Sequence, residues 1–169
     1  MTLEVRQAEG QRDLDEARRL FRAFLAWHRS RPGGARDQVD AYFDEPAWEA
    51  ELAWLPGVYD PPEGALLLAW LDGAAVGCVA MRPLGSGACE MKRMYVEQAG
   101  RGRGVGRALA DAVVDAAISA GHSEMVLDTS VDQHEAIGLY RSLGFTETEP
   151  YYDLGPELRR WLLFFRLPL

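Results

Sequence analysis

The sequence is poor in residues that bind metals or form disulfides, since its 169 residues include two cysteines and three histidines. Two cysteines cannot complete a tetrahedral zinc site by themselves. In a reducing compartment a chain of this size keeps its thiols reduced, so Cys78 and Cys89 are expected to be free and buried rather than paired. We expect no metal cofactor and no disulfide.

The chain also lacks a long apolar run. Its longest apolar stretches, around Ala65–Leu71 and Trp161–Phe165, are far shorter than the roughly 20 residues that a membrane-spanning helix needs. The first ten residues carry three charged side chains where a secretory signal would need an apolar core. We therefore expect no membrane partner and a cytoplasmic location.

Positive charge is scarce: 18 lysines and arginines stand against 26 acidic residues, for a formal net charge of -8. A nucleic-acid partner is not expected, because phosphate neutralisation needs clustered basic residues. The charge is also uneven, with nine acids and no Lys or Arg from Asp37 to Met81, and six basic against two acidic residues from Arg82 to Arg107. The two segments either meet partners of opposite charge or are only solvated surfaces.

What the sequence does contain is the balance of a folded protein, with 48% hydrophobic and 26% charged residues. A chain of this length buries one core and is too short for two typical domains. We expect a single domain over residues 1–169.

Periodicity predicts the elements of the first half. A strand is expected at Leu3–Gln7 and an amphipathic helix from about Asp13 to His28, ended by Arg31-Pro32-Gly33-Gly34. His28 extends the apolar stripe of this helix and is expected in the core. A second helical stretch is expected within Val39–Leu55, interrupted near Pro46.

A hairpin is expected next, because Asp72-Gly73 between the apolar runs Ala65–Leu71 and Ala75–Met81 favours a type I′ turn. Pro83–Gly87 predicts a second turn. The following strand, Cys89–Val96, should place Cys89, Met91, Arg93 and Tyr95 on one face and the alternate residues on the other.

Helices and strands alternate in the second half. Helices are expected from the Gly-rich loop to Gly121 and over Gln133–Leu143. Strands are expected at Met125–Asp128, after Gly144-Phe145, and at Trp161–Leu167. This order favours an α/β fold with a mixed sheet and helices on both of its faces.

The most distinctive motif is Arg101-Gly102-Arg103-Gly104-Val105-Gly106-Arg107, between a predicted strand and a predicted helix. Glycines let the backbone approach a ligand, and the free amides and dipole at a helix N-terminus favour phosphate. The motif lacks the Lys-Ser/Thr of a nucleotide P-loop and the third glycine of a dinucleotide fingerprint. It therefore predicts an anion-binding loop whose ligand is neither ATP nor NAD. A merely flexible loop stays an alternative.

Here the sequence resembles the GNAT (Gcn5-related N-acetyltransferase) superfamily. Arg101–Gly106 matches its signature Gln/Arg-x-x-Gly-x-Gly/Ala, Cys89–Val96 resembles its fourth strand, and Ala136–Phe145 resembles its second conserved block. The resemblance implies a central mixed, mostly antiparallel sheet of six to seven strands. It also implies acetyl-CoA as the acyl-donor substrate. Gln133 stands where many relatives carry an Asn that contacts the cofactor.

The resemblance further implies how acetyl-CoA is held. Amides from Gly102 to Arg107 would bind the pyrophosphate, the arginines would add charge, and the backbone of Met94 and Val96 would pair with the pantetheine arm. An amide there would polarise the thioester carbonyl. The implied acetyl-CoA-binding residues are Met94, Tyr95, Val96, Arg101, Gly102, Arg103, Gly104, Val105, Gly106, Arg107 and Gln133.

Two residues carry the implied catalysis. An alkylamine has a pKa of about 10, so transfer needs a base, and Glu90 matches the carboxylate that histone-acetylating members use. Tyr140 matches the general acid that protonates the leaving thiolate. The alternatives are a strand Glu90 that only pairs with Lys92 or Arg82, and a Tyr140 that only packs in the core.

The sequence thus predicts an acetyl-CoA-dependent N-acetyltransferase that acts on a primary amine by direct transfer in a ternary complex. The alternative is a non-catalytic acyl-CoA-binding sensor or interaction module on the same fold. The acceptor is a small molecule, an amino acid or a peptide amine, and the acids from Asp37 to Glu63 hint at a cationic one. The pattern leaves a homodimer open.

Overall fold

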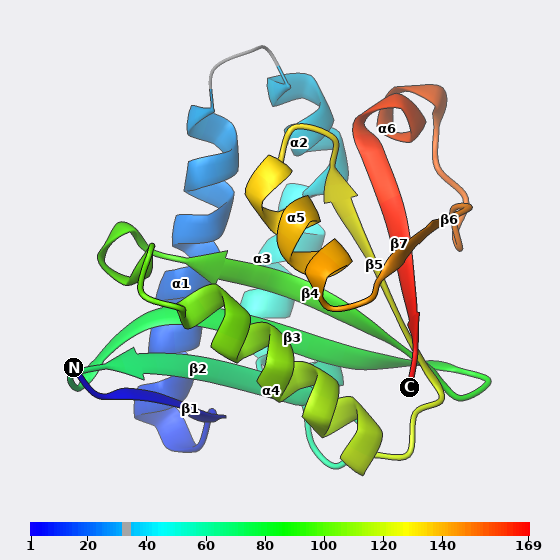
Figure 1. Ribbon diagram of the computed structural model, residues 1–169. Helices are drawn as coiled ribbons and strands as arrows, with labels where there is room; N and C mark the ends of the chain where they lie inside the picture. Colours follow the sequence, from blue (N-terminus) through cyan, green and yellow to red (C-terminus); the bar gives the residue numbers. More distant parts are fainter. Residues whose placement is uncertain (32–34) are drawn as a thin grey trace.

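The computed structural model describes residues 1–31 and 35–169 (Figure 1). The strands are β1 (Leu3–Gln7), β2 (Ala65–Leu71), β3 (Ala74–Gly85), β4 (Ala88–Val96), β5 (Glu124–Ser130), β6 (Thr146–Thr148) and β7 (Leu162–Pro168). The helices are α1 (Gly10–Ser30), α2 (Arg36–Tyr42), α3 (Glu45–Trp54), α4 (Val105–Ser119), α5 (His134–Ser142) and α6 (Pro156–Trp161), with short 3₁₀ turns η1 (Gly57–Tyr59) and η2 (Gln98–Gly100).

One seven-stranded sheet contains all these strands, in the order β1-β2-β3-β4-β5-β7-β6. Neighbouring strands run antiparallel except β4 and β5, which are parallel. Helices α4 and α5 cover one face, while α1, α2 and α3 cover the other (Figure 1). The predicted mixed, mostly antiparallel sheet with helices on both faces is confirmed.

Local sequence signals explain the first half of the chain. Helix α1 begins at Gly10, three residues before the predicted start, and the predicted stop at Arg31-Pro32-Gly33-Gly34 falls in part on residues 32–34, outside the described residues. The predicted interruption lies between α2 and α3, where the Asp44 carboxylate accepts a hydrogen bond from the Ala47 amide and caps α3.

The hairpin between β2 and β3 has the predicted turn, since Asp72 and Gly73 both adopt positive φ, at 50° and 85°. The prediction of a turn over the whole of Pro83–Gly87 is wrong in part. β3 continues to Gly85 and pairs Pro83 with Cys89, so that the turn is confined to Ser86 and Gly87. Helix α6 was not predicted at all.

Strand β4 contains a bulge that overturns its predicted alternation. Cys78 pairs with Tyr95 and Ala80 with Lys92, so β4 has one residue more than β3 between these pairs. Arg93 takes up the extra residue with a φ of 58°. Beyond it the faces exchange, so that Met94 and Val96, rather than Arg93 and Tyr95, share the α4 face with Cys89 and Met91.

Strands β4 and β5 stay together over three residue pairs only, from Ala88–Glu124 to Glu90–Val126. Past this point the ladder between them has no further pair among the described residues, while β5 continues to Ser130. The sheet therefore opens next to the bulge, between the second halves of β4 and β5. No helix among the described residues is long and apolar enough to span a membrane.

Candidate active site

A groove of about 530 Å³ lies where the sheet opens. It is bordered by the end of β4, the glycine loop, the start of α5 and the end of α1. The predicted acetyl-CoA-binding residues that line it are Met94, Tyr95, Val96, Arg101, Gly102, Gly104, Val105, Gly106 and Gln133. These residues come from distant parts of the sequence, and the fold brings them to one surface.

The glycine loop presents the N-terminus of α4 to this groove. Gly104 is the residue before the helix and adopts a φ of 79°, in the left-handed region that favours glycine. No side chain caps this end of the helix. The first four amides of a helix lack partners within it, so the groove faces backbone donors that can bind an anion.

The arginines around the groove behave differently from one another. Arg101 lines it and donates to the Val96 carbonyl oxygen at 3.1 Å. Arg107 pairs with Asp111 at 3.0 Å on the exposed side of α4, and neither Arg107 nor Arg103 lines the groove.

Sequence reasoning missed several groove residues, among them two at the end of α1. Trp27 and Arg31, at the end of α1, both line the groove, and the Arg31 guanidinium lies 4.6 Å from the centre of the Trp27 ring. Arg31 Nη1 is buried and has no hydrogen-bond partner in the described structure. A buried donor of this kind suits a polar ligand in the groove.

A second, smaller cavity of about 50 Å³ lies on the α1 side of the opened strands. Its wall combines charged residues (Lys92, Arg93, Asp128) with polar and aromatic ones (His28, Tyr42, Phe43, Ser130, Trp161). Met94, Gln133 and Tyr140 line both the groove and this cavity. The two spaces therefore meet at the bulge of β4 and the C-terminal part of α5.

Tyr140 is the predicted acid, and it lies at this meeting point. The residue is 6% exposed, and within the described part of the chain its hydroxyl makes a single, long hydrogen bond, to the Met94 sulfur at 3.9 Å. Burial, followed by the negative charge of Asp128, raises the pKa of Tyr140 well above its ordinary value. The phenol thus keeps its proton and has no strong competing acceptor.

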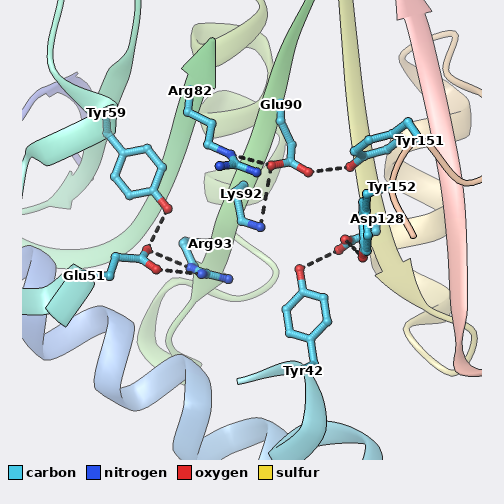
Figure 2. A network of polar contacts seen from close by, with 10 residues as sticks. All are labelled: Tyr42, Glu51, Tyr59, Arg82, Glu90, Lys92, Arg93, Asp128, Tyr151 and Tyr152. Carbon is cyan, nitrogen blue, oxygen red and sulfur yellow. Dashed lines mark hydrogen bonds and ion pairs between the residues drawn. The ribbon is translucent and has the colours of Figure 1, made fainter. Parts of the chain in front are cut away.

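Glu90 is the predicted base, and the structure places it in a buried ionic network (Figure 2). Its carboxylate accepts hydrogen bonds from Arg82 at 2.7 Å and Tyr151 at 2.6 Å, and Lys92 Nζ lies 3.6 Å away. Burial alone would raise the pKa of Glu90, but Lys92, Tyr151 and Arg82 outweigh it and lower the pKa. Glu90 lines neither the groove nor the cavity.

Asp128 is the carboxylate that does line the cavity. It lies on β5, just beyond the last pair with β4, and accepts hydrogen bonds from Tyr42 at 2.8 Å and Tyr152 at 2.6 Å. Sequence reasoning missed its role. The available signal was an acid within an apolar strand, Met125-Val126-Leu127-Asp128.

The bulge residue Arg93 is tied to α3. Its guanidinium donates two hydrogen bonds to the Glu51 carboxylate, at 3.0 and 2.7 Å, and Tyr59 donates a third to the same carboxylate at 2.6 Å. The ring of Trp48 lies 4.9 Å from the guanidinium carbon. The ion pair of Arg93 with Glu51 holds the positive φ of Arg93 at the point where the groove and the cavity meet.

The acids of the Asp37–Met81 segment do not build the cavity wall, because none of the nine lines it. Asp40 pairs with Arg29 and Arg36 on the surface, Asp44 caps α3, and Glu51 is bound to Arg93. The hint that these acids select a cationic acceptor therefore finds no support in the structure.

The minor predictions about His28 and the cysteines are confirmed. His28 is buried among aromatic rings, and burial followed by the charge of Arg31 lowers its pKa to about 4. Cys78 and Cys89 are both free and buried. Burial raises the pKa of the Cys89 thiol to about 12, which makes it a poor nucleophile.

The family model of the acetyltransferase (GNAT) family matches residues 21–145. This match covers most of the chain and includes the opened strands, the glycine loop and Tyr140. The chain belongs to the GNAT acetyltransferase family, as its motifs predict.

Curated relatives are acetyltransferases by name. An uncharacterized N-acetyltransferase of Schizosaccharomyces pombe is 46% identical over 104 residues, which are 60% of this chain and 64% of that protein. An IAA acetyltransferase of Azospirillum brasilense is 38% identical over 97 residues, 57% of this chain and 63% of that protein. The matches thus span less than two thirds of the length of these relatives.

Solved structures share the fold. A PaiA N-acetyltransferase from Thermoplasma acidophilum in complex with coenzyme A superposes with a TM-score of 0.74 at 15% identity, over 100% of both chains. A putative acetyltransferase from Salmonella typhimurium with acetyl-CoA superposes with a TM-score of 0.67 at 22% identity, over 99% of this chain and 94% of that one.

Proposed function

We propose that this protein transfers the acetyl group of acetyl-CoA directly to a primary amine. One observation carries the proposal: the large groove and the small cavity meet at Met94, Gln133 and Tyr140. Acetyl-CoA in the groove and the amine in the cavity would then have their reacting atoms close together. Proximity of this kind supplies much of the rate of a two-substrate reaction.

The groove suits CoA in its chemistry. The amides at the start of α4 can bind phosphate oxygens, and so can Arg31 Nη1, which has no hydrogen-bond partner among the described residues although Nη2 of the same side chain pairs with Asp132. Beyond the bulge, the edge of β4 that faces β5 has lost its strand partner and can pair with the amide-containing pantetheine arm. The solved relatives with CoA or acetyl-CoA support the same assignment.

Two proton movements accompany the transfer. The neutral amine nitrogen forms a bond to the thioester carbonyl carbon, the carbon–sulfur bond breaks, and the leaving thiolate takes a proton. We assign the Tyr140 hydroxyl as the donor of that proton. The hydroxyl is protonated before the transfer, because burial disfavours the phenolate.

The proton released by the amine needs an acceptor. Asp128 faces the cavity, and we assign it as the group that takes this proton directly. The role of Glu90 as base stays a prediction. Glu90 lines neither the groove nor the cavity, so a proton from the cavity would reach this residue only through intervening water.

An acceptor panel tests the proposal. The protein is incubated with acetyl-CoA and single amines, amino acids or peptides, and both CoA thiol and acetylated product are quantified. We expect equimolar thiol and acetylated amine for at least one acceptor class. Binding of acetyl-CoA without product for any acceptor would instead favour the non-catalytic acyl-CoA-binding module.

A further inference from the structure

The wall of the small cavity has hydrogen-bond donors that lack acceptors. Lys92 is one of them: its side chain is 15% exposed, and its nearest anionic oxygen, on Glu90, is 3.6 Å away, beyond hydrogen-bonding distance. Trp161 is the other: the residue is 9% exposed, and its indole Nε1 is buried without a partner among the described residues. Both side chains line the cavity.

Both donors lie near the ring of Tyr42. The Tyr42 ring is 5.7 Å from Lys92 Nζ and 6.2 Å from the Trp161 ring, and Tyr42 lines the cavity as well. The Tyr42 hydroxyl donates to Asp128, and within the described residues no hydrogen bond joins it to Lys92 or Trp161. A ligand in the cavity can supply an acceptor atom to these two donors.

The neighbouring carboxylates already accept hydrogen bonds from other side chains (Figure 2). Glu90 accepts from Arg82 and Tyr151, Glu51 accepts from Arg93 and Tyr59, and Asp128 accepts from Tyr42 and Tyr152. Arg82 and Arg93 each have a hydrogen-bonded carboxylate, whereas the ion pair of Lys92 with Glu90, at 3.6 Å, is too long for a hydrogen bond. A buried donor left without an acceptor destabilises the empty site, and an anionic oxygen would satisfy it.

We propose that Lys92 and Trp161 bind a carboxylate of the acetyl acceptor, so that the acceptor is an amine with a carboxylate close to its amino group, as in an α-amino acid. This inference rests on the proposed function and names its substrate class. The cavity volume of about 50 Å³ equals roughly one to two water molecules of the liquid. It holds a carboxylate and the adjoining carbon, while the rest of the acceptor extends outward.

Charge complementarity supports the same class of acceptor. Lys92 and Asp128 line the cavity with opposite charges, and Asp128 lies on β5 while Lys92 lies on β4. A zwitterionic amino acid matches both, with its carboxylate towards Lys92 and its ammonium towards Asp128. A simple alkylamine would leave Lys92 unsatisfied.

The test compares matched acceptors that differ in the carboxylate alone: leucine against isoamylamine, and phenylalanine against phenethylamine. We expect the wild-type kcat/KM to be about 10- to 100-fold higher for each amino acid, the range expected for a hydrogen bond to a charged group. Lys92→Met should abolish this preference, so that the kcat/KM values for each amino acid and its matched amine become equal within about twofold. Lys92→Arg keeps the charge and should retain part of the preference.

Trp161→Phe provides a second variant, since it removes the N–H donor and keeps most of the ring. It should lower the preference for the amino acid several-fold. Equal kcat/KM values for amino acid and amine in the wild type, or an unchanged preference in Lys92→Met, would overturn the inference while leaving the proposed transferase activity intact.

If no acceptor is acetylated, the proposed function is rejected. The carboxylate site is then tested by binding instead of turnover. Calorimetry with CoA present should detect the amino acid and not its amine partner, and Lys92→Met should remove that binding. Equal binding of the two compounds, or no binding of either, would overturn the carboxylate site.

Discussion

Acidification should destabilise this protein through His28, a buried residue of the cavity wall. Burial lowers the folded-state pKa of His28 to about 4, against an ordinary value of 6.5. Between these values the unfolded chain binds more protons at this residue, so its stabilising contribution is complete above pH 6.5 and is lost as the pH falls towards 4. At pH 5 the linkage relation gives a loss of about 2 kcal/mol from His28 alone.

His28→Gln isolates this contribution. The variant has no imidazole to titrate, and its packing cost is present at both pH values and therefore cancels from the difference. Urea unfolding at pH 7 and pH 5, followed by tryptophan fluorescence, gives the free energy of unfolding of each protein. The wild type should lose about 2 kcal/mol more than the variant between the two pH values. Equal losses would refute the reasoning, as would an imidazole that titrates near 6.5 by NMR in the folded protein.

Other predictions concern the site. Gly104→Val should weaken CoA binding at least about tenfold by calorimetry. Gly121→Val is the control, because Gly121 is another open position of positive φ but lies outside the groove, and this variant should leave CoA binding unchanged. Equal CoA affinities of the two variants would contradict anion binding by the glycine loop. Asp128→Asn should lower kcat/KM and shift the acidic limb of its pH profile, whereas Glu90→Gln should leave that limb in place; the reverse pattern would restore Glu90 as the base. Glu51→Gln should lower the free energy of unfolding by about 3–5 kcal/mol, because it leaves buried Arg93 without its carboxylate; a loss below about 1 kcal/mol in denaturant unfolding would contradict that role for the pair.

Local signals made the scaffold predictable. The Asp72-Gly73 turn and the glycine loop act through a few adjacent residues whose backbone preferences do not depend on distant contacts. Helix α6 also had such a signal that was overlooked, since Pro156 follows Gly155 and occupies the first helical position.

The inner surface of the site was not predictable in the same way. The bulge depends on Arg93 adopting a positive φ that its type disfavours, and Glu51, 42 positions earlier, supplies the bidentate ion pair that holds it. Without the bulge, simple alternation places Met94 on the wrong face. Glu90 lies in the last residue pair before β4 and β5 separate, and Asp128 lies two residues past it, a difference that no local pattern of either strand encodes.

We propose above that acetyl transfer takes place where the groove meets the cavity, beside the Tyr140 hydroxyl. Single-turnover acetyl transfer by Tyr140→Phe tests it most directly, because the variant removes the proton donor alone and the measurement is free of product release. We predict a transfer rate lower by about 10- to 10⁴-fold, with the Kd of acetyl-CoA within about twofold of the wild-type value. An undiminished single-turnover rate in a folded variant would contradict the claim and leave Tyr140 as a residue of the core.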